Sequence, residues 1–249
     1  MVGSTAELAG ERPSRGRGVL DGAFALLEAL REAEEAGLTA LSASSGLPKA
    51  TAYRLLEQLA ELGAVEHRGC RYRMGSRVFR LGLGWQPHPR LRAAADTPIR
   101  QLAAATDASV AICVLREGRT LAAFGVPGMV DHLAPVRPGA SWPWHTSAGK
   151  VLVAFAPPEA PLSSLPASWS REASAIRETG VCLDREELIT GVCCAAAPVT
   201  TQHGDVVGAV CAMVTPSQDI TKMANAVQRA GRIVSAGLRR PTISSVPLR

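Results

Sequence analysis

Residues 46–54 limit the possible folds more than any other part of this chain. They read Gly-Leu-Pro-Lys-Ala-Thr-Ala-Tyr-Arg and follow residues 38–45, a segment long enough for about two helical turns. Thr39 is the predicted N-cap of that first helix. Gly46 can take the left-handed conformation that closes a helix, and Pro48 suits the first turn of the next one. The stretch therefore predicts a short helix, a tight turn and a second helix.

The second predicted helix has one apolar side and one polar end. Its apolar residues recur at helical spacing, and the side expected to face the core comprises Ala52, Leu55, Leu59 and Leu62. The exposed N-terminal end then carries Lys49, Ala50, Thr51, Tyr53 and Arg54. Lysine and arginine can bind phosphate or guanine, threonine can reach a phosphate or a thymine methyl group, and tyrosine adds a hydroxyl. Because recognition helices present this end to DNA, the pattern predicts a DNA-binding helix-turn-helix.

A basic hairpin is predicted directly after these helices. Residues 64–67 and 71–75 read as two short extended runs around a glycine-containing turn. Arg68, Arg71 and Arg73 would lie along the DNA backbone as the wing of a winged helix-turn-helix. The alternative is an ordinary pair of helices with a solvated polar face. The turn, the apolar stripe and the basic hairpin together favour the DNA-binding interpretation.

The basic charge of the chain is concentrated in the same region. Residues 49–92 contain nine lysines and arginines against three acidic residues, which gives this segment a net charge of +6. The whole chain has a net charge of only +5, so the remainder is nearly neutral. Attraction to phosphate requires such a local excess of positive charge. The charge pattern therefore predicts double-stranded DNA as a partner of this part of the chain.

The sequence predicts five segments. They are a polar, flexible arm (1–17), a winged helix-turn-helix domain (18–75), a linker helix (76–95), an effector-binding and oligomerisation domain (96–241) and a tail (242–249). Residues 19–33 are predicted to form a helix that packs across the helix-turn-helix. The apolar stripe of this helix comprises Leu20, Phe24, Leu27 and Leu30. Pro87 and Pro89 interrupt the linker helix.

The second half of the chain alternates predicted helices and strands. Helices are expected at 98–106, entered through a proline, at 150–156 and at 223–238. Hairpins are expected from the paired β-rich segments 108–115 with 120–125 and 195–200 with 206–214. Strands in hairpins with accompanying helices are typical of an α+β sensor domain.

Composition excludes several classes of protein. A chain of 249 residues with 47% hydrophobic content suits one large or two modest domains. The N-terminus lacks the apolar run of a signal peptide, and no segment predicts a membrane span, so we expect a cytoplasmic protein. The six cysteines show no zinc-site spacing and are expected to stay reduced. We therefore predict no metal and no cofactor.

Four motifs resemble those of the IclR family of transcriptional regulators. Residues 46–56 are similar to the family's G-L-P-K-S-T-x-Y-R-L-L, with Ala50 in place of the usual serine. Residues 146–150 read T-S-A-G-K and resemble T-A-x-G-K. Further along, the chain resembles R-x-x-G, then D, E and G-V-x-C-x-A-A-P-V, at 177–180, Asp184, Glu187 and 191–199. The motifs occur in the family's order, and the resemblance runs from about residue 19 to residue 238.

The resemblance implies an α+β protein in which a linker helix joins a winged helix-turn-helix to a GAF-like effector-binding domain. It also implies homodimers or homotetramers that bind palindromic operators, and that repress or activate in response to a small molecule. The effector-binding positions implied by the motifs are Ser147, Ala148, Asp184, Cys194, Cys211 and Met213. Free N–H groups at the helix start near Ser147 would favour a carboxylate.

Two of the implied effector positions depart from the family pattern. Cys211 and Met213 stand where many relatives have serines, and sulfur makes a pocket softer and more apolar than hydroxyl groups do. We therefore predict an organic acid or an aromatic effector that is bulkier and less polar than a two- or three-carbon acid. In the alternative interpretation, both residues only pack the core, where cysteine and methionine are common.

Three other functions are left open by the sequence. In a thiol-based redox regulator, Cys70 or the adjacent Cys193 and Cys194 would be oxidised, which requires exposed thiols with a lowered pKa. In an enzyme, His145, Ser147 and Lys150 would act together, and Asp184 would complete a triad-like set. No nucleophile motif accompanies them, and we predict no catalytic residue. A scaffold that binds protein through the helix-turn-helix needs no basic wing, and salt-sensitive DNA binding would distinguish a regulator from it.

Overall fold

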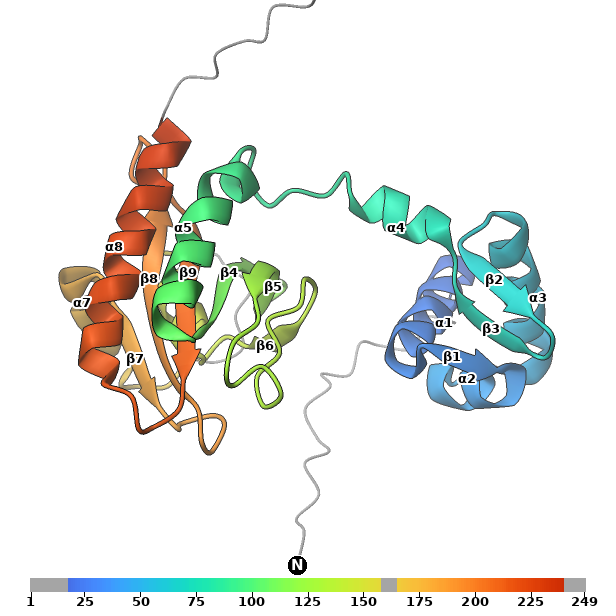
Figure 1. The fold of residues 1–249 in the computed structure, drawn as a ribbon. Coiled ribbons are helices and arrows are strands. Elements are labelled where there is room, and N and C mark those ends of the chain that lie inside the picture. The colour runs from blue at the N-terminus through green and yellow to red at the C-terminus, as the bar shows by residue number, and fades with distance from the viewer. Residues whose placement is uncertain (1–17, 158–164, 240–249) are drawn as a thin grey trace, which may run out of the picture. The chain divides into compact units, whose positions relative to one another are not determined.

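The computed structural model describes residues 18–157 and 165–239. The chain divides into two compact units, Met1–Trp85 and Gln86–Arg249 (Figure 1). We refer to them as the N-terminal unit and the C-terminal unit. None of the helices in the described ranges combines the length and the apolar composition that a membrane span requires.

The N-terminal unit has the order of elements expected for a winged helix-turn-helix. Its helices are α1 (Val19–Ala33), α2 (Leu38–Ser45), α3 (Lys49–Glu61) and α4 (Ser76–Gly82), and its strands are β1 (Glu35–Gly37), β2 (Val65–Arg68) and β3 (Arg71–Met74). The three strands form an antiparallel sheet in the order β1-β3-β2. The predicted helices and basic hairpin are therefore confirmed, while the short strand β1 was not predicted.

The turn between α2 and α3 follows the prediction closely. Gly46 has φ +66° and ψ +24°, and its amide donates to the carbonyls at the end of α2. The Ser42 hydroxyl also donates to the Leu47 carbonyl oxygen at 2.7 Å. The prediction of Thr39 as the N-cap is wrong, because α2 already begins at Leu38 and Gly37 occupies the cap. Gly37 pairs with Arg71 at the end of β1, so the chain enters α2 directly from a strand.

Two details of the predicted apolar stripes are also wrong. Leu62 is 54% exposed, because α3 ends at Glu61, and Leu56 is fully buried in its place. Leu20 and Phe24 of α1 are 74% and 65% exposed. The buried side of α1 instead comprises Gly22, Leu26, Ala29 and Leu30, a stripe at the same helical spacing but rotated around the helix.

The predicted linker helix at 76–95 is too long. Helix α4 ends at Gly82, and a new helix, α5 (Leu91–Thr106), begins beyond the two prolines. Pro98 lies inside α5 and does not start it. The helix extends ahead of this proline because Leu91 and Ala95 are fully buried in the core of the C-terminal unit, and this packing outweighs the lost backbone hydrogen bond.

A six-stranded antiparallel sheet forms the centre of the C-terminal unit. Its spatial order is β6-β5-β4-β9-β8-β7. The strands are β4 (Ser109–Arg116), β5 (Arg119–Val126), β6 (Ser141–Pro143), β7 (Cys182–Arg185), β8 (Cys193–Thr200) and β9 (Val206–Val214). The two predicted hairpins, β4–β5 and β8–β9, are confirmed and lie side by side through the β4–β9 pairing. The short strands β6 and β7 were not predicted.

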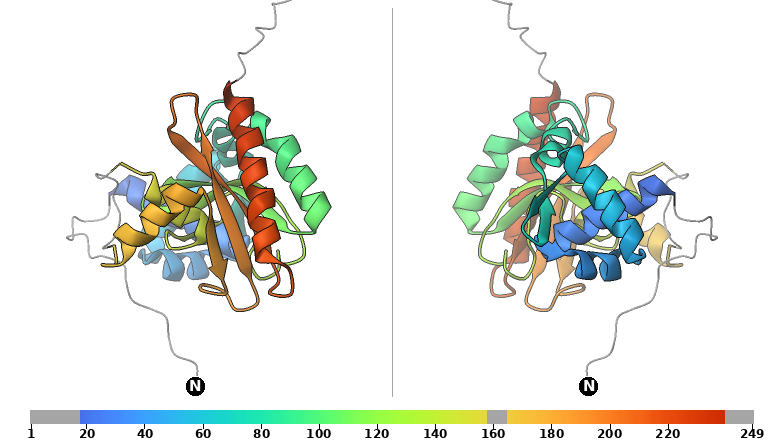
Figure 2. Two further views of the ribbon diagram at one scale, coloured as in Figure 1. Left: turned by 90° about the vertical axis from the view of Figure 1, so that its left-hand side faces the viewer. Right: turned by 90° about the vertical axis from the view of Figure 1, so that its right-hand side faces the viewer.

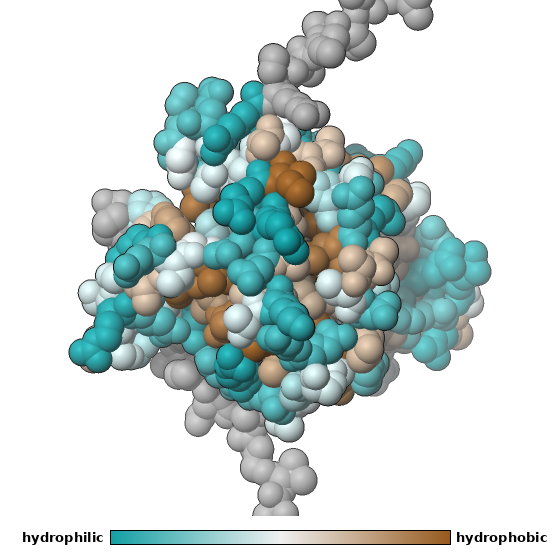
Figure 3. Space-filling model, turned by 60° about the vertical axis from the view of Figure 1, so that its left-hand side comes forward, coloured by the Kyte–Doolittle hydropathy of each residue, from teal (hydrophilic) through white to brown (hydrophobic). Residues whose placement is uncertain are grey.

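Helices cover both faces of this sheet. Helices α5 and α8 (Ile220–Arg239) pack together on one face (Figure 2). Helices α6 (Ser147–Ala154) and α7 (Trp169–Thr179) pack together on the opposite face, where α6 contacts β8 and β9. Helix α7 was not predicted. Figure 3, which brings the outer side of α8 forward, shows mostly hydrophilic side chains with smaller apolar patches between them.

The sheet separates two hydrophobic cores because successive side chains of a strand point to opposite faces. Cys193 and Ala195 of β8 belong to the core under α5 and α8. Cys194 and Ala196 belong to the core on the side of α6 and α7. The described structure therefore confirms an N-terminal helix-turn-helix followed by a C-terminal α/β domain, and it places the adjacent cysteines 193 and 194 in different environments.

Candidate effector pocket and DNA-binding surface

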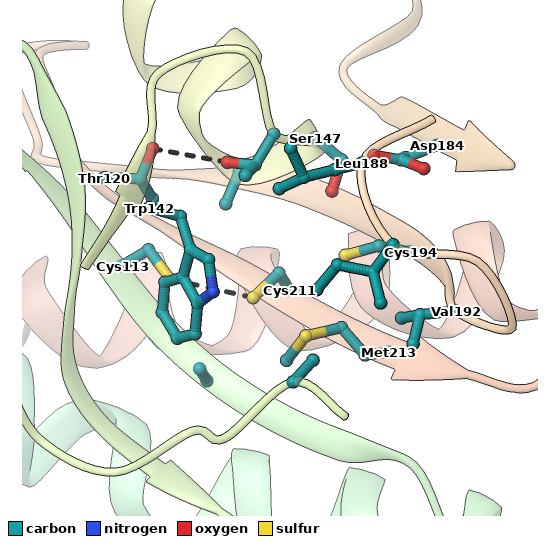
Figure 4. Close-up of a pocket in the computed structure, with 15 residues that line it drawn as sticks. Cys113, Thr120, Trp142, Ser147, Asp184, Leu188, Val192, Cys194, Cys211 and Met213 are labelled. Carbon is teal, nitrogen blue, oxygen red and sulfur yellow. Dashed lines mark hydrogen bonds between the residues drawn. The ribbon is translucent and has the colours of Figure 1, made fainter. Parts of the chain in front are cut away.

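A pocket lies between the sheet and the start of α6 (Figure 4). All six effector positions implied by the motifs line it, although they are spread over 67 residues of sequence from 147 to 213. The motifs did not indicate its other lining residues, which include Ala111 and Cys113 of β4, Thr120 of β5 and Trp142 of β6. The alternation of β4 was the available signal, because it places residues 111 and 113 on one face.

The start of α6 provides the polar end of the pocket. Thr146 caps the helix, and its hydroxyl oxygen accepts the Gly149 N–H at 3.1 Å. The next residue, Ser147, is fully buried, and its Oγ has no hydrogen-bond partner within the described residues. The first amides of a helix also lack acceptors within the helix. Together these donors form a position suited to a carboxylate.

Gly149 explains why the chain can turn so tightly into α6. A Cβ atom at this position would lie 2.1 Å from the Trp144 carbonyl oxygen and 2.2 Å from the Thr120 Oγ1. No side chain can be accommodated at such distances. The glycine of the T-S-A-G-K motif therefore allows the helix start to approach the β5 and β6 strands and to close one end of the pocket.

Sulfur atoms form the wall contributed by the sheet. Cys113 on β4, Cys211 on β9 and Cys194 on β8 are buried on the same face, and Met213 lies next to Cys194 through the β8–β9 pairing. The Cys113 and Cys211 Sγ atoms are 3.7 Å apart. These positions are diagonal neighbours in the pairing, because residue 211 lies opposite Ala111. The result is an apolar, polarisable wall.

Asp184 supplies the pocket's carboxylate from the edge strand β7. It pairs with Cys194 across the β7–β8 ladder, is only 5% exposed, and its Oδ1 accepts the Glu187 N–H at 2.9 Å. Burial raises the pKa of Asp184 above its ordinary value, although the hydrogen bond from Glu187 opposes this shift. Asp184 can accept a hydrogen bond from a donor group of a bound molecule at the end of the pocket away from Cys113.

The pocket is small. Its cavity volume is about 50 Å³. A single water molecule takes about 30 Å³ in the liquid, and sites for small organic ligands are usually several hundred Å³. Part of the wall must therefore move before a molecule the size of an aromatic acid can enter.

The buried thiols do not have the properties of redox-sensor cysteines. Burial raises the pKa of Cys182 to about 12 and also raises the pKa of Cys193. The contact with Cys211 and burial raise the pKa of Cys194 well above its ordinary value. Because the thiolate is the reactive form, these groups are poor nucleophiles. Cys70, in the turn of the wing, is exposed.

Of the residues considered for an enzyme, His145 and Ser147 do not form a nucleophile–base pair in the structure. The His145 side chain is exposed and its ring contacts Trp144 edge-on. Ser147 is buried, and its hydroxyl has no partner among the described residues. A nucleophilic serine requires a hydrogen bond to its general base. Among the described residues, the geometry therefore provides no general base for Ser147.

The candidate DNA-binding residues of α3 lie on one accessible surface. Lys49, Ala50, Tyr53 and Arg54 are exposed at its N-terminal half, and Thr51 is half-buried. The opposite side of the helix is buried in the core of the N-terminal unit. The structure thus brings together all five predicted positions at the end of the helix that recognition helices present to DNA.

The three wing arginines differ in their contacts. Arg71 forms an ion pair with Glu35 at 3.0 Å, and Arg73 donates from Nε to the Glu66 carboxylate at 2.9 Å. Arg68 is exposed and forms no ion pair within the described ranges. The sequence did not show this difference, because it depends on the register that places Glu66 opposite Arg73. Of the three, Arg68 is the one whose charge is uncompensated.

Comparison with known proteins agrees with this geometry. Residues 19–69 match the IclR helix-turn-helix domain, and residues 87–236 match the domain described as bacterial transcriptional regulator IclR C-terminal. The chain belongs to the IclR family. It is therefore a helix-turn-helix transcriptional regulator with a C-terminal effector domain. Its family membership argues against an enzyme.

Individual relatives are regulators of the same kind. The chain is 32% identical to the glycerol operon regulatory protein of Streptomyces coelicolor over 208 residues, 77% of this chain and 82% of the relative. It is 28% identical to the HTH-type transcriptional regulator KdgR of Dickeya chrysanthemi over 202 residues, which are 74% of this chain and 66% of the relative.

Solved structures of the family share the fold. An IclR homolog from Microbacterium hydrocarbonoxydans, crystallised with 4-hydroxybenzoate, has a TM-score of 0.79 at 19% identity, covering 89% of this chain and 99% of that chain. Pseudomonas aeruginosa HmgR has a TM-score of 0.70 at 20% identity, covering 89% and 99%. At these identities the likeness concerns the fold alone.

Proposed function

We propose that this regulator binds a palindromic operator through the N-terminal half of α3 and the wing, and that a small organic acid in the sulfur-walled pocket controls this binding. The N-terminal unit is the DNA-binding part, and residues from 86 onward form the effector-binding part. The observation that carries the proposal is the convergence of a buried, unpaired Ser147 hydroxyl, a helix start and Asp184 on one otherwise apolar pocket. A cytoplasmic location follows from this role.

On the DNA side, Lys49 and Arg54 contribute most of the affinity. Their charges are exposed at the end of α3, where phosphates and base edges of the major groove are within reach. Thr51 and Tyr53 contact phosphates or thymine methyl groups, and the small Ala50 allows a close approach. Arg68 contacts the backbone next to the major groove. Arg71 and Arg73 chiefly hold the wing together through their ion pairs.

On the effector side, the pocket favours a carboxylate attached to an apolar or aromatic body. The start of α6 and Ser147 bind the carboxylate, and Asp184 accepts a hydrogen bond from a hydroxyl or amino group of the ligand. The body packs against Cys211 and Met213, because sulfur makes favourable contacts with aromatic rings. The fold neighbour crystallised with 4-hydroxybenzoate carries a ligand of this class, which makes that compound a suitable first probe.

Exposed apolar side chains on two helices of the N-terminal unit suit a homodimer. The residues are Val19, Leu20 and Phe24 of α1 and Phe79, Leu81 and Leu83 in and just after α4, each more than half exposed. Helix α4 has seven residues and no buried one, and so short a helix is not stable without packing. A second copy related by twofold symmetry would cover such side chains and match the symmetry of a palindrome. A homotetramer is the alternative assembly.

The deciding experiment measures operator binding and the change in that binding when an effector is added. Fluorescence anisotropy would follow the purified protein on DNA from upstream of its own gene at two salt concentrations, with and without 4-hydroxybenzoate or glycolate. We expect saturable, competitor-resistant binding to one palindromic segment, with a response to the aromatic acid. Asp184→Ala should abolish that response and spare DNA binding. If Asp184→Ala responds like the wild type, Asp184 is not part of the effector site.

A paired substitution tests the sulfur wall. Cys211→Ser combined with Met213→Ser should shift the ratio of dissociation constants for 4-hydroxybenzoate and glycolate by about tenfold toward glycolate, because hydroxyl groups replace apolar contacts. Isothermal titration calorimetry gives both constants. An unchanged ratio would mean that Cys211 and Met213 only pack the core.

A further inference from the structure

The connection between β7 and β8 closes one side of the pocket. We call residues 186–192 the pocket loop; its Leu188, Ile189 and Val192 line the cavity, and Asp184 lies just before it. Figure 4 shows Ser147, Leu188 and Asp184 along the same side of the pocket, away from the Cys113–Cys211 wall. Because the cavity is about 50 Å³, a ligand enters only if such a wall moves.

Hydrogen bonds between its own residues hold the pocket loop together. The Gly191 amide donates to the Glu186 carboxylate at 2.7 Å, and the Val192 amide donates to the Ile189 carbonyl oxygen at 3.1 Å. The Glu186 amide in turn donates to the Val192 carbonyl oxygen at 3.2 Å. These contacts let the loop move as a unit without disturbing the β7–β8 pairing.

Apart from the Glu187 N–H bond to Asp184 inside the hairpin, one polar contact fastens this unit to the rest of the domain. The Lys150 ammonium on α6 donates to the Glu187 carboxylate at 2.7 Å. Over residues 18–157 and 165–239, no other hydrogen bond or ion pair joins the pocket loop to an element outside the β7–β8 hairpin. Lys150 lies one turn after Ser147 on the same helix, so the contact lies directly beside the polar end of the pocket.

The two ends of this contact differ, because Lys150 is mostly buried whereas the Glu187 side chain is 51% exposed. The Lys150 side chain is only 12% exposed, and it also contacts Glu172 of α7 at 2.9 Å. Burial alone would lower the pKa of Lys150, but the hydrogen bonds to Glu187 and Glu172 outweigh it and raise the pKa, so the ammonium stays charged. Glu172 holds the ammonium in place when Glu187 leaves, which makes the Glu187 contact the one that opens reversibly.

We propose that Lys150 and Glu187 form a latch that holds the pocket loop over the effector pocket, and that an effector enters when this ion pair opens. Lys150 and Glu187 are positioning residues and do not touch the ligand. The meaning of the latch for regulation rests on the proposed function of the pocket. Whether the ion pair holds the pocket loop closed is a separate question, and it can be tested without effector or DNA.

The cysteines of the chain report on opening. Cys194 lies under the loop in the pocket, Cys193 lies in the core on the opposite face of the sheet, and Cys70 is exposed on the wing. Local opening of the loop exposes Cys194 and leaves Cys193 protected, whereas unfolding of the domain exposes both. The rate of alkylation by iodoacetamide, resolved by tandem mass spectrometry for each cysteine at one fixed pH, therefore distinguishes the two events.

Removing the latch should speed the labelling of Cys194. We expect Glu187→Gln and Lys150→Met each to raise the Cys194 rate by about tenfold while the Cys193 and Cys70 rates stay unchanged. Glu172→Gln is the matched control, because it removes the other carboxylate on Lys150 and leaves the loop fastened; its Cys194 rate should stay within about twofold of the wild type. Lys150→Arg keeps the cation and should restore slow labelling.

Salt provides a second measurement on the unmodified protein. Raising NaCl to about 0.5 M should speed Cys194 labelling in the wild type and have no effect in Glu187→Gln, since salt screens the ion pair. Equal Cys194 rates in wild type and Glu187→Gln would overturn the latch and leave the effector function standing. A parallel rise at Cys193 would overturn it as well, because the ion pair would then stabilise the whole domain. Loss of the aromatic-acid response with normal labelling would instead contradict the proposed function.

Discussion

The recognition helix and the effector pocket arrange their proposed functional side chains in opposite ways. On α3, five neighbouring residues lie on one exposed helix end, and a single element positions them all. In the pocket, buried residues from several strands, α6 and the pocket loop converge on one small cavity. The first site depends on exposure and charge, whereas the second depends on packing. Substitutions should therefore affect affinity at α3 and stability or selectivity at the pocket.

The largest effect is expected from crowding the pocket's helix start. Gly149→Ala would place a methyl group within 2.2 Å of two oxygen atoms, and we expect the C-terminal unit to lose about 3 kcal/mol or more of unfolding free energy. Urea unfolding followed by circular dichroism measures this loss.

The matched control for that variant is Gly204→Ala in the β8–β9 turn. Gly204 has φ +91° with open space around it, so alanine costs only about 1–2 kcal/mol of backbone strain. If both variants lose the same free energy of unfolding, the close contacts at Gly149 do not contribute to stability, and this prediction is wrong.

The next largest effect is expected at the exposed site. Arg54→Ala should weaken operator binding by about 1–3 kcal/mol, roughly 10- to 100-fold, and leave the thermal unfolding midpoint unchanged, since Arg54 contacts solvent in the free protein. Anisotropy titrations against the operator measure the affinity.

Arg171→Ala serves as its control, because it removes an exposed arginine from α7 in the other unit. This control should bind the operator normally. Full operator binding by Arg54→Ala would show that the recognition surface lies elsewhere on the N-terminal unit.

A smaller effect should separate two arginines of the wing. Arg68→Ala should weaken binding about three- to tenfold and reduce the salt dependence of the binding constant by about one released ion. Arg73→Ala should change the salt dependence less, because Glu66 already compensates its charge. Titrations at four salt concentrations give both slopes. Identical slopes for the two variants would mean that Arg73 leaves Glu66 for a phosphate when the wing meets DNA.

The smallest effect is expected on the free energy of unfolding, from the carboxylate of Asp184. The pKa of Asp184 is raised in the folded state, so the folded protein binds more protons than the unfolded one from about 3.8 up to the raised value. The contribution of Asp184 to stability therefore decreases as pH rises through this window. Asp184→Asn removes the decrease and should be slightly more stable than the wild type at pH 7. Urea midpoints between pH 4 and pH 7 check the sign, and a growing advantage of the wild type with pH would contradict it.

The sequence by itself determined the helix-turn-helix and most of the secondary structure. The turn at Gly46, the stripe on α3 and the two hairpins depend on near neighbours in the chain, whose conformational preferences act locally. The motifs also identified six pocket residues, although only through their resemblance to a family. Strand β7 escaped prediction because it has only four residues, whereas helix α7 does carry buried residues at helical spacing, Trp169, Ala173 and Ile176, and this signal was missed.

Only the tertiary structure decided which of these residues meet. The sulfur wall arises because β4 and β9 pair in a register that brings Cys113 to 3.7 Å from Cys211, across about a hundred residues of chain. The pairing of Arg73 with Glu66 and the contact of Lys150 with Glu187 depend equally on register and on helix placement. Such contacts are set by the packing of the whole domain, and no local pattern encodes them.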